Sequence, residues 1–314
     1  MATTVHWTDK DKDEIGRLAL DLGADQVSFL ALQDYVSPAS PDPRRYLPDL
    51  GSFVILAFRE LRGAYMNQSI MRIEGMWSQD TVWETVEYRL GKYLEDSYDV
   101  DIMPVPQHRP FEVTPETWRR IIGPVSIRHL AVQSGMGVFG NNTLVVHPKW
   151  GSMVRFGVLL TTAKVDSDPP LDNFDPCSQC SYPCVENCPA NAIVDGIVKQ
   201  NRCTRYSQPY DVGNFMRAAL KMADMSREEI KDFVRTPHFF NLYMASMRYM
   251  FYRCIECTRG CRGSEMRPEY AEEIPIPTNA TSLADPNSQD YSIFDQGHWD
   301  PAQLNHTVEQ TEDA

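Results

Sequence analysis

The residues with the clearest chemistry are eight cysteines, all between positions 177 and 261 of the 314-residue chain. The first run spans residues 177–189 with the spacing C-x2-C-x3-C-x3-C-P, and the second spans 254–261 with the spacing C-x2-C-x3-C. Cys203 stands alone between them. A close run of thiolates that ends in Cys-Pro is typical of [4Fe–4S] clusters. Eight thiolates make two sets of four, which predicts two clusters and one-electron transfer between them.

The ligand sets follow from the rule that, in two-cluster ferredoxins, the fourth cysteine of a run ligates the other cluster. Cluster one is predicted to bind Cys177, Cys180, Cys184 and Cys261. Cluster two is predicted to bind Cys188, Cys203, Cys254 and Cys257. Residues 181–183 put three positions, where the usual run has two, between the second and third cysteines. We therefore expect the loop to bulge there.

Other uses of these cysteines fit the pattern less well. Structural zinc sites pair C-x2-C motifs with each other or with histidines, and no histidine is near the first run. A degenerate or single-cluster site is a further alternative. A disulfide framework suits small secreted chains, whereas residues 1–14 are polar and carry no export signal. No stretch approaches the roughly 18 apolar residues of a membrane span. We expect a cytoplasmic protein without a membrane partner.

The elements that must position the cysteines follow an order of strands and helices typical of an α+β protein. Residues 52–58 read SFVILAF, which predicts a strand buried on both faces. Helices are predicted over 8–23 and 78–98 from apolar residues at helical spacing, and a second strand over 153–161. From about Pro169 cysteines and loop residues dominate the sequence. We therefore predict domains at 1–168 and 169–264, followed by an acidic extended tail at 265–314.

Charge is unevenly distributed along the chain. Residues 262–314 hold eleven acids and two bases, so −9 of the net charge of −13 lies there. The remaining body is nearly balanced and lacks the basic footprint of a nucleic-acid binder. We therefore expect no nucleic-acid partner. The tail is either a docking strap for a redox partner or a solubilising extension.

Several segments resemble the superfamily of epoxyqueuosine reductases and reductive dehalogenases. The stretches GPVSIRHLA (123–131), SGMGVFGNNTL (134–144) and HPKWGS (147–152) are similar to conserved blocks of that superfamily. The two cysteine runs then follow in the expected order. The resemblance covers residues 120–262 well and the first 120 weakly.

The resemblance implies a nitroreductase-like α/β sandwich that binds a corrinoid, followed by a ferredoxin-like two-cluster module. Cofactor contacts would come from Gly135, Gly137, Gly140, Asn141, Asn142 and Thr143. The glycines would let backbone approach the macrocycle, although a helix cap and a tight turn explain them equally. Catalytic candidates are Arg128, His129 and His108; a histidine such as His129 also serves as a structural residue.

Two positions at which the sequence differs from epoxyqueuosine reductases bear on which reaction the protein catalyses. The proton-donating aspartate of epoxyqueuosine reductases is matched by Ile121, and the lysine of their GKN motif by Asn141. We therefore expect reductive dehalogenation or deoxygenation of a small molecule, fed by a low-potential donor such as ferredoxin or flavodoxin. The alternatives are a divergent epoxyqueuosine reductase and a cobalamin-free electron-transfer protein.

Overall fold

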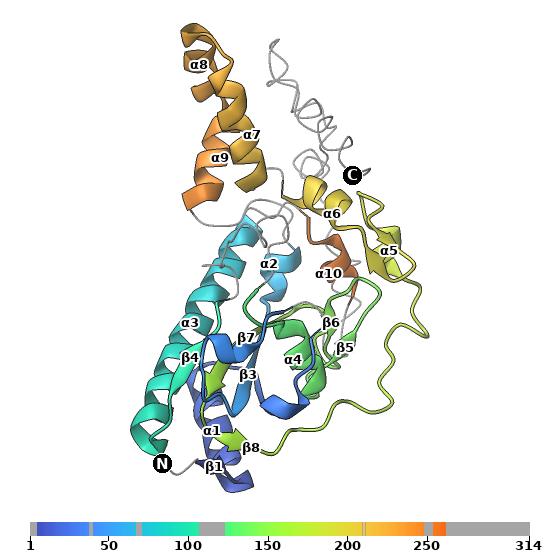
Figure 1. The fold of residues 1–314 in the computed structure, drawn as a ribbon. Coiled ribbons are helices and arrows are strands. Elements are labelled where there is room, and N and C mark those ends of the chain that lie inside the picture. Colours follow the sequence, from blue (N-terminus) through green and yellow to red (C-terminus); the bar gives the residue numbers. More distant parts are fainter. Residues whose placement is uncertain are drawn as a thin grey trace.

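The computed structural model describes residues 5–37, 40–66, 71–106, 123–208, 210, 212–247 and 254–261. Its centre is a four-stranded antiparallel sheet with the strand order β2-β3-β7-β4 (Figure 1). The strands are β2 (Gln26–Ala31), β3 (Ser52–Arg59), β4 (Ile102–Pro104) and β7 (Val154–Thr161). The mixed α and β architecture expected from the sequence is confirmed.

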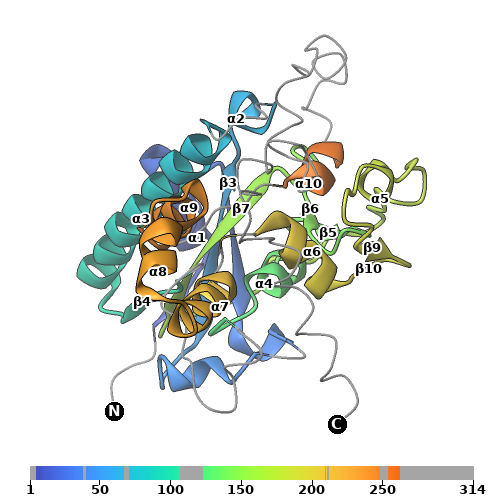
Figure 2. The same cartoon turned by 90° about the horizontal axis from the view of Figure 1, so that it is seen from above.

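Strand β3 is buried from Ser52 to Phe58, as its continuous apolar run predicts. Successive side chains of a strand point to opposite faces, so β3 supplies two cores. Val54, Leu56 and Phe58 belong to the core beneath the helices α1 (Asp9–Leu22) and α3 (Met71–Tyr98). Phe53, Ile55 and Ala57 belong to the core beneath α4 (Ile127–Gln133). The sheet therefore lies between helices on both faces (Figures 1 and 2).

Helix α1 illustrates how local sequence sets these elements. Thr8 and Asp11 form a capping box at its start, and Gly23 ends it with a φ of 119°, in the left-handed region that glycine adopts without strain. Ile15 and Ala19 face the sheet and are fully buried. Helix α3 begins before the predicted Ser78, at Met71, and turns Trp83, Val86, Leu90 and Leu94 toward the same core.

Small elements complete this sandwich. A parallel pair joins β1 (His6–Trp7) to β8 (Lys164–Val165), and an antiparallel pair joins β5 (Val138–Phe139) to β6 (Val145–Val146). Helix α2 (Arg62–Met66) packs on α3. Short 3-10 turns lie at Leu32–Asp34 and Pro43–Arg45.

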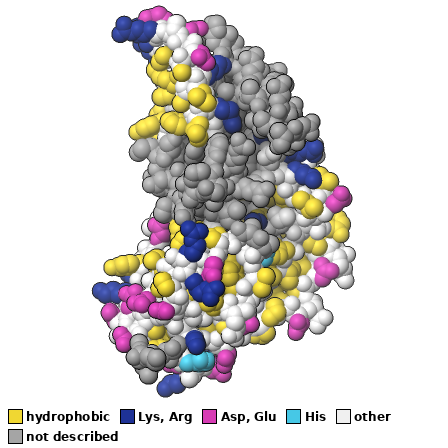
Figure 3. Space-filling view, in the orientation of Figure 1, with side chains coloured by type: hydrophobic (Ala, Val, Ile, Leu, Met, Phe, Trp, Pro, Cys, Tyr) yellow, Lys and Arg dark blue, Asp and Glu magenta, His cyan; other side chains and the backbone are white. Residues whose placement is uncertain are grey.

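The cysteine-bearing segments lie at one end of the sandwich (Figure 1). Their elements are α5 (Pro183–Glu186), the hairpin of β9 (Ile193–Val194) and β10 (Ile197–Val198), α6 (Gln200–Ser207) and α10 (Glu256–Gly260). Between α6 and α10 stand three helices, α7 (Val212–Ala223), α8 (Arg227–Val234) and α9 (Pro237–Met247). Their small core contains Tyr210, Ala218, Phe233 and Leu242. Figure 3 shows hydrophobic side chains exposed on this helical group. Phe215, Leu220 and Phe240 are among its exposed hydrophobic residues.

The domain boundaries remain predictions. The acidic tail at 265–314 lies outside the described residues. Across the described part of the chain, no helix combines the length and apolar character that crossing a membrane requires.

Candidate metal centre

The two cysteine runs meet where α5 packs against α10. Tyr182 adopts a φ of 58° directly before α5, and Pro183 occupies the first turn of that helix, so the extra residue is absorbed by a tight left-handed turn. This is the bulge that the sequence predicts between the second and third cysteines. At the end of α10, a Cβ added to Gly260 would lie 3.2 Å from the carbonyl carbon of Pro183 and 3.3 Å from the nitrogen of Cys184. Glycine at this position lets the two runs approach.

The thiols interact electrostatically in two separate groups. Burial raises the pKa of Cys254 to about 11, with smaller contributions from the Glu256 carboxylate and then from the thiols of Cys188 and Cys203. Burial raises the pKa of Cys257 to about 12, with further contributions from Cys254, Cys203 and Cys188. A second group centres on Cys184 and Cys261, whose thiol pKa values are raised mainly by burial and further by neighbouring thiols of that group. The interacting thiols of this second group are Cys177, Cys180, Cys184 and Cys261.

These groups have the same members as the two ligand sets predicted from spacing. Eight thiols, each near others of its set, suit the donor chemistry of two cubane clusters. Backbone N–H groups also donate to the sulfur atoms, as Tyr182 does to Cys180 at 3.4 Å and Ala192 to Cys188 at 3.3 Å. Within the described residues, no three His, Cys, Asp or Glu side chains converge to hold a single metal ion. A [4Fe–4S] cubane does not require several side chains around one ion, because its four thiolates bind four separate iron atoms.

The loop between β5 and β6 connects this centre to the sandwich. The loop is closed by hydrogen bonds from Thr143 N to Gly140 O and from Gly140 N to Leu144 O, and Thr143 has a φ of 59°. The buried Asn142 side chain accepts from Leu144 N at 3.1 Å and donates to the carbonyl of Cys257 at 3.3 Å. Nearby, the backbone of Ser152 donates to the carbonyl of Cys261 at 3.0 Å.

The three glycines expected to face a corrinoid each lie against the chain itself. A Cβ added to Gly135, which has a φ of 80°, would meet the carbonyl oxygen of Pro169 at 2.3 Å. One added to Gly137 would meet the carbonyl oxygen of Val146 at 2.6 Å, and one at Gly140 would meet the Val146 side chain at 2.7 Å. Contacts within the chain therefore account for glycine at all three positions. Their predicted cofactor role remains untested.

The remaining predicted site residues have individual positions. Arg128 is exposed and donates from Nη1 to the carbonyl of Thr143 at 2.7 Å, so it holds the β5–β6 loop. His129 Nδ1 lies 2.6 Å from Ser126 Oγ, and burial lowers its pKa. Asn141 lies beside Gly196 in the β9–β10 hairpin, 3.4 Å from where a Cβ would stand. His108 and Ile121 lie outside the described residues.

A group of buried charged residues was missed at the sequence level. Glu87 of α3 accepts a hydrogen bond from Val158 N at 2.8 Å, and burial raises its pKa to about 8. Arg155 Nε donates to Glu60 Oε1 at 2.7 Å, with the Glu60 side chain almost fully buried. Burial also raises the pKa of Asp80 to about 6, against the opposing effect of Arg155. A signal was available, since Glu87 directly follows Val86 on the face of α3 that packs on the sheet.

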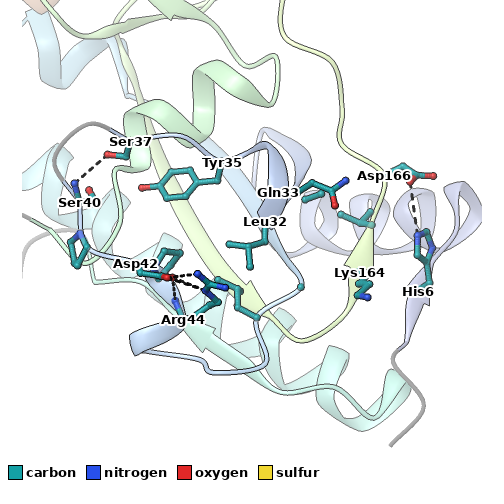
Figure 4. A pocket seen from close by; sticks show the side chains of 16 residues that line it. His6, Leu32, Gln33, Tyr35, Ser37, Ser40, Asp42, Arg44, Lys164 and Asp166 are labelled. Carbon is teal, nitrogen blue, oxygen red and sulfur yellow. Dashed lines mark hydrogen bonds and ion pairs between the residues drawn. The ribbon is translucent and has the colours of Figure 1, made fainter.

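An open cavity of about 640 Å³ lies near β1 and β8, at the end of the sandwich away from the cysteines (Figure 4). Its lining includes Tyr35, Arg44 and Lys164. Arg44 is held by Asp42, and His6 lies 3.9 Å from Asp166. None of the predicted site residues lines this cavity, so it is separate from the candidate metal centre.

No family model matches the chain. Individual proteins do. Over 110 residues the chain is 32% identical to an epoxyqueuosine reductase from Synechococcus sp. strain CC9605, covering 33% of each protein. Over 84 residues it is 36% identical to an epoxyqueuosine reductase from Vibrio cholerae, covering 26% of this chain and 22% of that protein. Over these stretches the chain is similar to epoxyqueuosine reductases. These matches are partial: the first three such relatives are matched over 22% to 37% of their own lengths.

Solved structures show that the similarity also holds for the fold. An epoxyqueuosine reductase from Streptococcus thermophilus superposes with a TM-score of 0.51 at 17% identity, over 85% of this chain and 67% of that one. A catabolic reductive dehalogenase in complex with 3-bromo-4-hydroxybenzoic acid gives 0.52 at 14% identity, over 98% of this chain and 51% of that one. The superfamily resemblance inferred from the motifs is thereby confirmed.

The comparisons correct one expectation. The balanced charge of the body predicted no nucleic-acid partner, and this prediction is wrong: the curated relatives are epoxyqueuosine reductases, and epoxyqueuosine is a nucleoside of tRNA. Net charge misleads here because it averages over the surface, whereas RNA contacts depend on local patches. The relatives also favour the tRNA alternative over small-molecule dehalogenation.

Proposed function

We propose that this epoxyqueuosine reductase relative is an iron–sulfur oxidoreductase that reduces a modified nucleoside in tRNA. The observation that carries the proposal is the arrangement of the eight thiols. They form two electrostatic groups of four and are joined, through Asn142 and Ser152, to the segment that resembles epoxyqueuosine reductases. The sequence identity to enzymes of that name points to the same chemistry.

In this proposal each group of thiols holds one [4Fe–4S] cluster, with the ligand sets given by spacing. The clusters supply single electrons from an external low-potential reductant. The chain contributes the surroundings: it partly buries Cys254 and Cys257, and it directs backbone N–H groups at Cys180 and Cys188. Free thiols and a tRNA substrate are both consistent with a cytoplasmic location.

A corrinoid is proposed from the comparisons alone. One reductive dehalogenase with the same fold is described as supporting B12-dependent dehalogenation, at a TM-score of 0.51. In this chain, intrachain contacts already account for glycine at Gly135, Gly137 and Gly140, so these residues give the corrinoid no independent support. No step of the proposed mechanism depends on the corrinoid, and cobalt analysis tests whether it binds.

Removal of oxygen from an epoxide to leave an alkene consumes two electrons and two protons and releases water. Ile121 cannot supply a proton.

The test is expression in a bacterial strain that lacks its epoxyqueuosine reductase, followed by mass spectrometry of tRNA nucleosides. We expect conversion of epoxyqueuosine to queuosine, with about eight irons per chain after anaerobic purification. Cys257→Ser should abolish conversion and remove about four irons. The control Ser178→Ala, at an exposed position next to Cys177, should do neither.

Each alternative has its own result in this experiment. Unchanged epoxyqueuosine with full iron content would refute the tRNA reaction. Dehalogenation of a bromophenol by the same preparation would then favour the small-molecule reading. Full iron with neither activity would favour an electron-transfer protein.

A further inference from the structure

Helix α6 carries an unbalanced run of positive charge. Residues 196–210 contain three bases and no acid, in a chain whose net charge is −13. The bases are Lys199, Arg202 and Arg205, and all three are exposed. They span about 9 Å along the helix axis at 1.5 Å per residue.

The same helix carries a predicted ligand of cluster two. Cys203 is half-buried and Ser207 is buried, and their side chains lie 3.9 Å apart, one helical turn from each other. With 3.6 residues per turn, Arg202 and Arg205 lie about 100° and about 160° around the helix from Cys203, whereas Lys199 caps the helix one turn before Cys203. A partner bound to these bases would be within one helix diameter of Cys203.

The positive charges on α6 are not neutralised by the rest of the described chain. Arg202 donates to the backbone carbonyl of Asn191 at 3.3 Å, a neutral acceptor. Among the described residues, none of the three bases forms an ion pair. Within the described part of the chain, this exposed row of cations has no acidic partner and can bind an external anion.

Helix α8 shows what an ordinary charged helix of this chain looks like. It also presents three exposed bases, Arg227, Lys231 and the capping Arg235. Here acids alternate with them, and Lys231 Nζ lies 2.6 Å from Glu228 Oε1. Acids and bases balance over residues 227–235, so α8 offers the same number of cations without a net field.

We propose that the face of α6 formed by Lys199, Arg202 and Arg205 binds the phosphodiester backbone of tRNA. This inference rests on the proposed function and adds the surface through which the RNA is held. Phosphate suits the face because guanidinium groups bind phosphate oxygens with two parallel hydrogen bonds, and two of the three bases are arginines. Backbone contacts of this kind position an RNA without reading its sequence.

The experiment compares two variants that change charge equally. One is K199Q/R202Q/R205Q on α6, and the matched control is R227Q/K231Q/R235Q on α8. Each is purified anaerobically as the iron-loaded protein, and binding of a fluorescein-labelled tRNA-Tyr transcript is followed by fluorescence anisotropy from 50 to 200 mM salt.

We expect the α6 variant to bind tRNA about 10- to 100-fold more weakly, with a salt slope reduced by about 2 to 3, since each lost phosphate contact lowers the slope by about one. The α8 control should bind as the unchanged protein does. Because Arg202 and Arg205 flank Cys203, iron content is measured on every variant, and R202K/R205K, which keeps the charge, should retain most of the affinity.

The outcomes separate this inference from the function on which it rests. Equal weakening in both variants, or none in the α6 variant, overturns the α6 surface while leaving tRNA reduction standing. Unchanged tRNA binding with slower reduction by an acidic ferredoxin would assign the face to an electron donor instead. A shifted cluster potential alone would mean that the bases balance the charge of the cluster. If the unchanged protein binds no tRNA and restores no queuosine, the proposed function itself fails.

Discussion

In the sandwich, strand β3 is buried on both faces and contributes to two apolar cores, each with sixteen buried residues. In the described segments 169–208 and 254–261, the buried hydrophobic side chains are Cys184, Ala192, Ile193 and Ile255. The first region can be stable through burial of apolar surface alone. The second has too little buried surface for that, so its stability must come from its cysteines and whatever they bind. The contrast teaches that the sandwich can fold without metal, whereas folding of the cysteine-bearing region is coupled to metal loading.

The largest expected effect is that of iron removal. Chelation of the anaerobically purified protein should unfold the cysteine-bearing segments, because their ligand bonds replace a hydrophobic core. Hydrogen exchange should then become fast at residues 183–207 and 254–261 and stay slow in β3 and β7. Equal protection of both regions after complete iron loss would show that the second region is stable without metal.

A substitution that opens a cavity in the sandwich should destabilise the sandwich and leave the iron content unchanged. Leu90→Ala removes a fully buried side chain from the core beneath α3 and should cost about 2–5 kcal/mol of unfolding free energy. Denaturant unfolding measures the loss. Iron per folded chain should stay constant, since the clusters do not depend on that core. Leu220→Ala, at an exposed position of α7, is the control and should change stability little.

The pH dependence of the sandwich tests its buried acid. Burial raises the pKa of Glu87 from an ordinary value of 4.5 to about 8. The folded state then binds the proton more tightly than the unfolded one, so the stabilisation is complete below pH 4.5 and is lost as pH rises toward 8. Glu87→Gln should remove this slope, which amounts to a few kcal/mol. Denaturation at several pH values compares the two; an unchanged slope in the variant would assign the effect to other groups.

The sequence predicted the sandwich well because its elements repeat one simple rule. The continuous apolar run of residues 52–58 leads to β3, and the helical spacing of apolar residues over 8–23 leads to α1. Each depends on neighbours in the chain. Glu87 and the contact of Asn142 with Cys257 depend on residues 71 and 115 positions away, and no local pattern contains them. Gly135, Gly137 and Gly140 were assigned to cofactor binding from a motif. In the structure, contacts within the chain account for glycine at these positions.

The smallest expected effect lies at the boundary between the regions, where Asn142 donates to the carbonyl of Cys257 and accepts from Leu144. Asn142→Ala removes both bonds from a buried position and should cost about 1–2 kcal/mol, too little to unfold the sandwich. Because the lost contact joins the loop to the second cysteine run, iron should leave faster under a chelator, while the denaturation midpoint moves only slightly. Gln33→Ala, a polar change at the far cavity, provides the control. Faster iron release in the Asn142 variant alone would mean that the sandwich steadies the metal centre through this contact; equal release would make the two regions independent in that respect as well.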